Sequence, residues 1–339
     1  MTETRERTDV AIIGGGPVGL FAIFECGMLG MRAHVFDALD TVGGQCAALY
    51  PEKPIYDIPA YPRIEAAELI DRLAEQALPF SPRYHLGSQV ERIEREAEGW
   101  LLTNAAGACV AAKAVIVAAG VGAFGPNRPP LAGIEAFEGK SVHYYVKRRE
   151  DFRDKRVVIA GGGDSAVDWA LSLADCAKQV MVVHRRPKFR AAPESAARLE
   201  ALAAQGAIDL VIPFQLAALE GEGSSLSAVL VDSLKGERRR LEADMLLPFF
   251  GLSMNLGPIA EWGLDLERSH IRVEPASCAT SVPGIFAIGD IATYPGKLKL
   301  ILSGFAEAAL AAHAARPLVF PGEALHFEYS TTSGVPRLS

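Results

Sequence analysis

The sequence has few cysteines, and none of them is placed for disulfide or zinc chemistry. Its five cysteines stand at positions 26, 46, 109, 176 and 278. No two of them form a C-x-x-C pair, and no His/Cys cluster has the spacing of a zinc site. We therefore expect reduced structural cysteines in a cytoplasmic protein, and no metal site.

Long apolar runs and an excess of basic charge are also missing. Each apolar run is interrupted by glycine, proline or a charged residue before about 18 residues, so no membrane-spanning helix is predicted. The segment formed by the first nine residues is rich in charge and lacks the apolar core of a signal peptide. The net charge of −7 argues against nucleic acid as the main partner.

The chain does have a repeated alternation of strands and helices over its 339 residues. Strands are predicted at 9–13, 33–36 and 115–119, with a helix at 17–29. After a segment rich in glycine and proline, 121–133, the pattern restarts. Further strands are predicted at 156–160, 180–183, 245–250 and 283–288, and helices at 164–176 and 303–315. The sequence thus predicts two α/β domains whose parallel sheets are covered on both faces by helices.

The first glycine-rich turn, in AIIGGGPVGL at 11–20, has the pattern of a dinucleotide site. Gly14 allows a tight turn, Gly16 leaves room for a pyrophosphate, and Gly19 lets the helix pack close to the strand. Asp37 ends the next strand, where an acid would bind the adenosine ribose hydroxyls. Because a carboxylate repels a 2′-phosphate, this turn suits FAD or NAD rather than NADP.

The second glycine-rich turn, in VVIAGGGDSAVDWA at 157–170, is followed by basic residues instead of an acid. Gly161, Gly163 and Ala166 repeat the dinucleotide pattern. The next strand ends in His184, Arg185 and Arg186, with Lys188 and Arg190 close behind. Guanidinium groups match phosphate geometry, so this site is predicted to bind NADPH. A flavin fed by a nicotinamide accounts for both sites on one chain.

Several motifs in order along the chain resemble the thioredoxin-reductase-like flavoproteins. They are GGGPVG at 14–19, GGQC at 43–46, GGGDSA at 161–166, HRRPKFRA at 184–191 and PGIFAIGD at 283–290. The run GGQCAALYPEKPIYDIPAYP at 43–62 and the tail HFEYSTTS at 326–333 are similar to the type 2 ferredoxin–NADP reductases.

This resemblance implies an α/β fold of two Rossmann-like domains, with an NADPH domain inserted into an FAD domain. The expected boundaries are 1–123 for the first part of the FAD domain, 124–250 for the NADPH domain and 251–339 for the second part. Connecting strands near 120–125 and 248–252 would be hinges about which the NADPH domain swings. The resemblance also implies a homodimer, whose C-terminal tail covers a flavin.

The resemblance assigns site residues as well. Tyr50 and Tyr329 would stack on the two faces of the flavin ring. No essential acid or base is assigned, although Asp57 and His326 are candidates for handling protons near the ring. The FAD residues would be Gly14, Gly16, Pro17, Gly19, Asp37, Gly44, Gln45, Tyr50, Val90, Phe124, Asp290 and Thr331. The NADPH residues would be Gly161, Gly163, Asp164, Ala166, His184, Arg185, Arg186 and Arg190.

The region where a thioredoxin reductase carries its C-x-x-C pair reads SVHYYVKRRED at 141–151 and has no sulfur. Electrons must therefore leave the flavin directly, and the resemblance implies ferredoxin, or flavodoxin, as the acceptor. An acidic ferredoxin needs a basic docking surface, for which the candidates are 147–149, 238–240 and Lys297 with Lys299. Two alternatives remain: an NADPH-dependent flavin or quinone reductase or oxidase without a protein acceptor, and a non-catalytic FAD/NADPH redox sensor.

Overall fold

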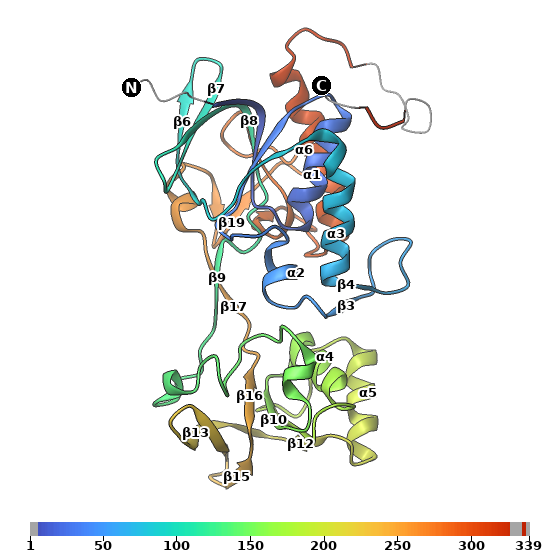
Figure 1. Cartoon of the computed structure of the whole chain (residues 1–339), viewed down its shortest axis with the longest axis vertical. Helices are drawn as coiled ribbons and strands as arrows, with labels where there is room; N and C mark the ends of the chain where they lie inside the picture. Colours follow the sequence, from blue (N-terminus) through green and yellow to red (C-terminus); the bar gives the residue numbers. More distant parts are fainter. Residues whose placement is uncertain (1–5, 326–333, 337–339) are drawn as a thin grey trace. The chain divides into compact units, whose positions relative to one another are not determined.

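The computed structural model describes residues 6–325 and 334–336, and for residues 123–126 and 252–253 it describes the backbone only. The chain divides into two compact units (Figure 1). Unit 1 combines residues 1–124 with 254–339, and unit 2 comprises residues 125–253. The two chain crossings between them are β9 (Ala123–Pro126) and β17 (Leu252–Asn255), which pair with each other.

Unit 1 is built on a seven-stranded sheet with the order β5-β2-β1-β8-β7-β6. β20 pairs in parallel with residues 115–117 of β8. β5, β2, β1 and β8 are parallel, whereas β7 and β6 continue the sheet antiparallel. The strands are β1 (Glu6–Ile13), β2 (Ala33–Phe36), β5 (Arg83–His85), β6 (Val90–Glu96), β7 (Gly99–Asn104), β8 (Cys109–Val117) and β20 (Ile285–Ala287).

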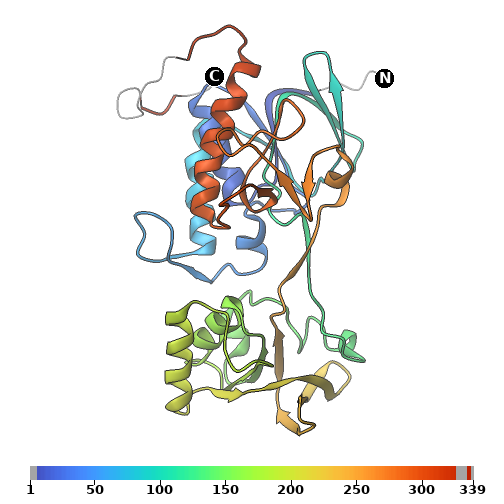
Figure 2. The ribbon, with the colours of Figure 1, turned by 180° about the vertical axis from the view of Figure 1, so that it is seen from behind.

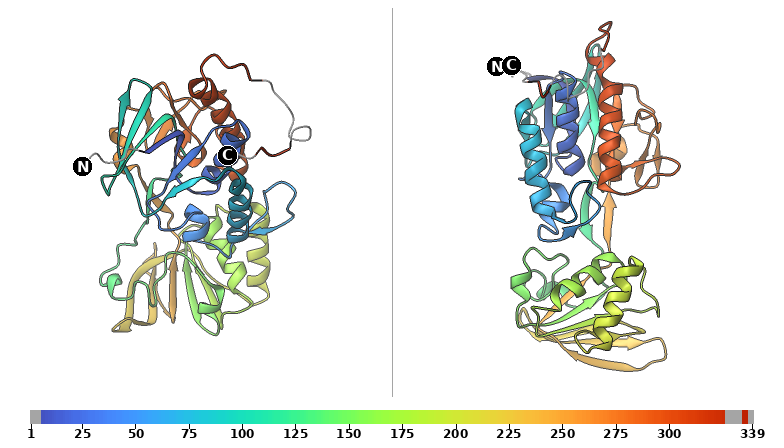
Figure 3. Two further views of the ribbon diagram at one scale, coloured as in Figure 1. Left: turned by 45° about the horizontal axis from the view of Figure 1, so that its top comes forward. Right: turned by 90° about the vertical axis from the view of Figure 1, so that its right-hand side faces the viewer.

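In the described residues, α-helices cover one face of this sheet, so the prediction of helices on both faces is wrong for unit 1, because the other face packs against the segment 256–292. α1 (Pro17–Met28) packs between α3 (Ala66–Ala77) and α6 (Ile301–Val319), as Figures 2 and 3 show. Alternation along β1 separates the two faces, because Val10 and Ile12 pack in the helix-side core while Ala11 and Ile13 pack in the core on the other face. Shorter elements complete the unit: α2 (Gly44–Ala48), β3 (Pro54–Ile55), β4 (Ile64–Glu65), β18 (Leu266–Glu267), β19 (His270–Arg272), β21 (Ala292–Thr293), and the 3-10 helices η1 (Leu78–Phe80), η4 (Gly257–Glu261) and η5 (Gly289–Ile291).

Unit 2 has a four-stranded parallel sheet of its own, with the order β12-β11-β10-β16. Val158 and Ala160 of β10 face a core shared with an antiparallel meander, β13-β14-β15, and α4 packs on β10 and β11. The elements are β10 (Arg156–Ala160), β11 (Gln179–Val183), β12 (Asp209–Val211), β13 (Phe214–Glu222), β14 (Ser225–Ser233), β15 (Arg238–Glu242), β16 (Met245–Pro248), α4 (Asp164–Leu173), α5 (Pro193–Ala204), η2 (Ile134–Ala136) and η3 (Arg149–Phe152).

Most predicted elements are present, with shifted ends. β2 and β10 have the predicted bounds, whereas β8 begins at Cys109, six residues before the predicted start at 115. The predicted helix at 164–176 ends at Leu173, and that at 303–315 extends from Ile301 to Val319. Among the described residues, no helix is long and apolar enough to cross a bilayer.

Candidate cofactor site

A cavity of about 460 Å³ lies within unit 1, where β1, β2 and β8 end. This is the edge at which parallel α/β sheets bind ligands, and the volume is in the range of small-molecule sites. Residues from both sequence pieces of unit 1 line it. Of the predicted FAD residues, it brings together Gly14, Gly16, Pro17, Asp37, Gly44, Gln45, Tyr50, Val90 and Asp290.

In the first glycine turn, two glycines pack so closely against the chain that no side chain would fit. The third glycine faces open space, where a ligand would lie. A methyl group at Gly14, whose φ is +110°, would be 2.3 Å from the carbonyl oxygen of Ala118. One at Gly19 would be 1.9 Å from the carbonyl oxygen of Gly14, whereas one at Gly16 would meet nothing within 4 Å. α1 then begins at Pro17, with no acidic residue in its first turn and no side-chain cap. Its N-terminal N–H groups can therefore bind a pyrophosphate.

Asp37 connects this turn to the cavity. Its Oδ2 accepts the N–H of Gly15 at 2.7 Å and its Oδ1 accepts that of Leu39 at 2.9 Å. Burial raises the pKa of Asp37, although hydrogen bonds from the backbone N–H groups oppose that shift. A carboxylate has about four acceptor positions, so acceptor capacity remains for ribose hydroxyls.

Tyr50 and Cys46 line the cavity side by side, from α2 and the turn after it. The Sγ of Cys46 lies 3.9 Å from the Tyr50 hydroxyl. Burial raises the pKa of Cys46 to about 11 and also raises that of Tyr50. Both groups are therefore neutral near pH 7, and the thiol is not a nucleophile there.

The turn that carries Asp290 is held by a buried carboxylate on α6. Glu307 is 2% exposed, and its Oε2 accepts the N–H of Gly289 at 2.7 Å. Its Oε1 accepts the Tyr294 hydroxyl at 2.7 Å and pairs with Lys297. This network fixes the Gly289–Asp290 turn against α6, beside the cavity.

Some cavity residues were not predicted from the sequence. Leu256, Ile259 and Trp262 come from η4 and its flanks. Ile301 is the first residue of α6, and Lys299 and Leu300 directly precede it. The only signal for the first group was apolar residues at intervals of three. The second group precedes the predicted helix and resembles an ordinary loop.

Other predicted residues lie away from the cavity or outside the described part. Gly19 supports the turn from within α1 and does not line the cavity. Asp57 is exposed and does not line it either. The backbone of Phe124 is in β9, but its side chain is not described. His326, Tyr329 and Thr331 lie outside the described residues.

The second glycine turn, in unit 2, is tied to the basic loop that follows β11. A methyl group at Gly161 would be 2.8 Å from the Phe249 carbonyl oxygen, whereas one at Gly163 would meet nothing within 4 Å. The N–H of Arg190 donates to the Gly162 carbonyl at 2.7 Å, and Asp164 Oδ1 accepts the N–H of Ala192 at 2.8 Å. The two motifs are therefore adjacent in space.

The basic side chains of this loop are available to a ligand. Arg185, Arg186, Lys188 and Arg190 are exposed. Within the described part of the chain, none of the four forms an ion pair. Four exposed cations beside an open glycine turn fit a phosphate group.

His184 has a different place from its basic neighbours. It is 6% exposed, its ring stacks on Phe189 with centroids 5.1 Å apart, and its Nε2 lies 3.2 Å from the Lys188 carbonyl oxygen. Its ring fills the space beside Gly162, where an added methyl group would be 2.1 Å away. Burial lowers the pKa of His184, so the ring is neutral at pH 7. The side chain supports the loop from inside.

The five cysteines include no neighbouring pair that could act as a redox dithiol. All five lie in the described part of the chain, and all are free thiols. Cys26, Cys46 and Cys278 are buried, and η3 (residues 149–152) occupies the segment where a C-x-x-C pair would be expected.

Comparisons with known proteins agree with two dinucleotide-binding turns on one chain. A family described as "Pyridine nucleotide-disulphide oxidoreductase" matches residues 8–315. A ferredoxin–NADP reductase of Paramagnetospirillum magneticum is 64% identical over 98% of this chain and 99% of its own. A ferredoxin–NADP reductase of Rhodospirillum rubrum is 64% identical over 98% of this chain and 97% of its own.

Solved structures show the same fold. Thioredoxin reductase of Lactococcus lactis has a TM-score of 0.80 and 25% identity, over 92% of this chain and 99% of its own. The T. acidophilum enzyme has a TM-score of 0.81 at 23% identity, over 92% and 98%. The predicted thioredoxin-reductase-like fold and the predicted resemblance are thus confirmed.

Proposed function

Because the chain belongs to the pyridine nucleotide-disulphide oxidoreductase family, and within it to the group of ferredoxin–NADP reductases, we propose that it transfers electrons between NADP(H) and ferredoxin through bound FAD. The observation that carries the proposal is the pair of glycine turns with opposite surroundings. Asp37 follows one of them, and four exposed basic residues follow the other. The absence of a dithiol among the five free cysteines agrees with direct transfer from the flavin to the acceptor.

In this proposal unit 1 holds FAD. The open side of Gly16 and the N-terminus of α1 receive the pyrophosphate, and Asp37 accepts the ribose hydroxyls. Gln45 and Asp290 line the flavin end of the cavity, where Tyr50 offers its ring as a stacking surface. Lys299, close to the start of α6, places a cation at the same cavity.

Unit 2 holds NADP(H). Gly163 and the start of α4 receive the pyrophosphate, and the guanidinium groups of Arg185, Arg186 and Arg190 receive the 2′-phosphate. His184 shapes the loop and does not contact the phosphate. FAD, when bound, accepts two electrons from the nicotinamide and gives them up singly, which is the chemistry that an iron–sulfur acceptor needs.

The C-terminal tail, the assembly and the location complete the proposal. We propose that Tyr329 and Thr331, which lie outside the described residues, cover the flavin, and that the protein is a homodimer of the cytoplasm. The expected domain boundary at 123/124 falls within β9, and that at 250/251 falls one residue before β17; in this proposal the two paired strands serve as hinges.

The ion pairs reduce the number of basic side chains that are available to dock ferredoxin. Arg238, Arg239 and Arg240 pair with Asp232, Glu237 and Glu220, and Lys297 is buried against Glu307. Arg148 and Arg149 pair with Asp151 and Asp175. Lys147 lies over the ring of Tyr145, and Lys299 contacts His270, which is not a carboxylate. Taking each unit by itself, we propose that Lys147 in unit 2 and Lys299 in unit 1 are better candidates for docking than the paired arginines of the same unit or the buried Lys297.

The test is anaerobic stopped-flow absorbance of the purified FAD-loaded protein, mixed first with NADPH or NADH and then with oxidised ferredoxin. Rapid bleaching by NADPH and not by NADH, followed by reoxidation with ferredoxin, is the expected result. Bleaching without reoxidation would reject the acceptor and leave a reductase or oxidase of small molecules. Binding of NADPH without bleaching would reject catalysis and leave a sensor.

A further inference from the structure

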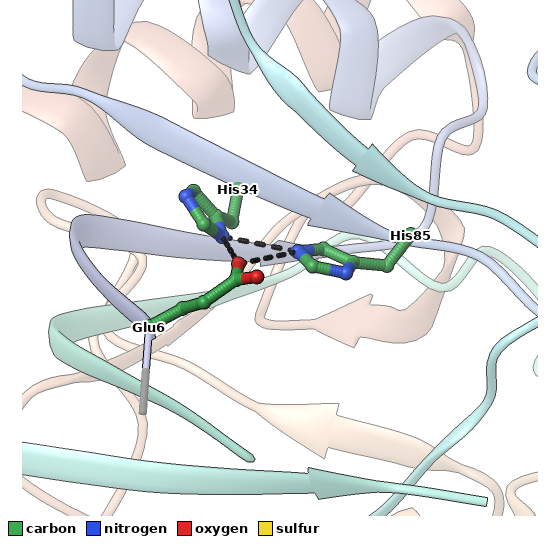
Figure 4. Close-up of side chains that lie close together, drawn as sticks. All are labelled: Glu6, His34 and His85. Carbon is green, nitrogen blue, oxygen red and sulfur yellow. Dashed lines mark hydrogen bonds and ion pairs between the residues drawn. The ribbon is translucent and has the colours of Figure 1, made fainter. Parts of the chain in front are cut away.

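A cluster of two histidines and a glutamate lies at the edge of the unit 1 sheet, outside every residue assigned to the redox function (Figure 4). Glu6 comes from β1, His34 from β2 and His85 from the end of β5, three strands that are neighbours in the sheet. His34 is on the face away from the helices, because its neighbours Ala33 and Val35 pack in the helix-side core. The three side chains point toward one another in Figure 4.

The spacing of the three ligand atoms suits a single metal ion. His34 Nδ1 lies 3.0 Å from His85 Nε2, and Glu6 Oε2 lies 3.7 Å from the first nitrogen and 3.9 Å from the second. Zinc binds nitrogen and oxygen at about 2.0–2.2 Å, so neighbouring ligands on one ion lie about 3–3.5 Å apart. A shift of a few tenths of an ångström by the Glu6 side chain brings all three atoms to that spacing.

Hydrogen bonding alone leaves part of this cluster unexplained. The two ring nitrogens can share one hydrogen, but Glu6 Oε2 is buried and has no hydrogen-bond partner. Its sister oxygen Oε1 is held by Arg83 at 2.6 Å. Buried polar oxygens nearly always have a partner, and a bound cation would supply one. Arg83 would then orient the ligating carboxylate from outside, as the outer partners of metal ligands do.

The state of the imidazoles agrees with a metal-ligand role. Burial lowers the pKa of both rings, that of His34 to about 4, so both are neutral and have a lone pair to donate at pH 7. The side chains of His34 and His85 are 12% and 14% exposed, and that of Glu6 is 31% exposed, so an ion can enter from the Glu6 side.

We propose that Glu6, His34 and His85 form a binding site for a divalent transition-metal ion of the zinc, copper or nickel class, with solvent completing its coordination. Imidazole nitrogen together with one carboxylate is a ligand set that these ions prefer. The ion ties three strands together next to the FAD cavity. The ring of His85 stacks on Phe36 with centroids 4.5 Å apart, and the backbone carbonyl of His85 accepts the N–H of Asp37 at 3.0 Å. The role of the ion is to hold in place the strand ends that carry Phe36 and Asp37.

The first test measures zinc binding by the FAD-loaded protein without an affinity tag. The protein is treated with a chelator, desalted and titrated with Zn²⁺ against a chromophoric competitor. One site per chain is expected, with affinity reduced at least about tenfold in both His34→Gln and His85→Gln. His143→Gln is the matched control, because His143 is in unit 2, where its Nε2 lies 3.0 Å from the Lys140 carbonyl oxygen. Equal affinity in all four proteins would overturn the proposal.

The second test identifies the ligands with one equivalent of Cu²⁺ and electron paramagnetic resonance, which oxidised flavin does not disturb. The spectrum is expected to show two coupled nitrogens, reduced to one in each histidine variant. If those variants lose their flavin or their circular dichroism, Glu6→Gln replaces them. It should bind more weakly and keep both nitrogens. A spectrum unaltered in Glu6→Gln, with undiminished affinity, would place the ion elsewhere and reject the site.

Discussion

Arg185 and Arg186 are exposed residues whose side chains have no partner within the described part of unit 2. Their position, next to a glycine turn with open space at Gly163, gives a phosphate two charge-assisted contacts. At the scale of single residues, we propose that these two side chains determine which nicotinamide cofactor the enzyme uses. Their loss should therefore change cofactor preference without changing the fold.

We predict that Arg185→Ala/Arg186→Ala raises KM for NADPH at least about a hundredfold, because hydrogen bonds to charged groups contribute about 1.5–3 kcal/mol each and two are lost. KM for NADH should change little, because NADH has no 2′-phosphate. Steady-state kinetics with both cofactors measure the change in KM for NADPH and the change in KM for NADH. Arg239→Ala is the control, since that guanidinium is already paired with Glu237. An equal loss for NADPH and NADH would contradict the assignment.

Cys46 lines the cavity as a buried thiol whose pKa is raised to about 11. Only the thiolate reacts with iodoacetamide, so the labelling rate should be very low at pH 8 and should rise only as the pH approaches 11. We predict that the two partly exposed cysteines, Cys109 and Cys176, are labelled before Cys46. Mass spectrometry of the FAD-loaded protein follows all three sites. Fast labelling of Cys46 at pH 8 would show that the thiol is activated.

At the residue scale, sequence reasoning selected residues that do line the cavity where one chemical requirement favours one residue type. The pattern of a tight turn beside a phosphate predicted Gly14 and Gly16, and that of a ribose site predicted Asp37; their binding of a cofactor stays a prediction. Sequence reasoning failed where the role depends on three-dimensional neighbours. Nothing in the local sequence shows that His184 is buried under Gly162, or that Lys299 reaches the cavity. The cluster of Glu6, His34 and His85, absent from the predicted sites, joins residues that are 28 and 51 positions apart.

At the scale of elements, the crossing of α1 and α6 determines the shape of the cavity. Gly304 of α6 faces Val18 of α1, and a methyl group at Gly304 would be 2.4 Å from Val18 Cγ2. Val18 also lines the cavity. The two helices therefore need a glycine here, and the cofactor site depends on their close approach.

We predict that Gly304→Ala destabilises unit 1 by about 1–3 kcal/mol, as overpacking of cores does, and weakens FAD binding by moving Val18 into the cavity. Val18→Ala should restore most of both losses when combined with Gly304→Ala. Thermal unfolding and FAD release monitored by fluorescence test the double-mutant cycle. Additive losses in the double variant would show that the two side chains do not meet.

The elements themselves were predictable where one pattern dominates. β10 and β2 are short apolar runs between turn residues, and both have the predicted bounds. β13, β14 and β15 were not predicted, because an antiparallel meander with one exposed face mixes charged and apolar residues. β15, for example, reads RRRLE, and its three arginines are stabilised by acids on β13, on β14 and in the intervening turn.

At the scale of the whole molecule, the chain builds one unit from its two ends and the other from its middle. The resemblance to a known family gave this arrangement. Periodicity alone indicated two similar halves in sequence order, because it does not show that β20 pairs with β8. The contact between the two ends is what makes unit 2 an insertion.

We predict that residues 125–253, expressed alone, fold cooperatively and bind NADP⁺, since the fragment keeps its parallel sheet, its helices and its meander. Residues 1–124 alone should stay unfolded, because β8 lacks β20 and α1 lacks α6. Circular dichroism melts and calorimetric titration with NADP⁺ measure both. An unfolded middle fragment would contradict the independence of unit 2.

The discontinuity of unit 1 also sets an order of events during translation. The ribosome releases the chain from its N-terminus, so every residue of unit 2 has been made once residue 253 is joined, whereas β20 and α6 are still to come. Domains generally fold as units when they are complete. Unit 2, the second domain along the chain, can therefore fold before unit 1 does, while residues 115–117 of the nascent β8 still lack their partner β20. Until α6 has been synthesised, residues 1–124 are the part of the nascent chain to which a chaperone is most expected to bind.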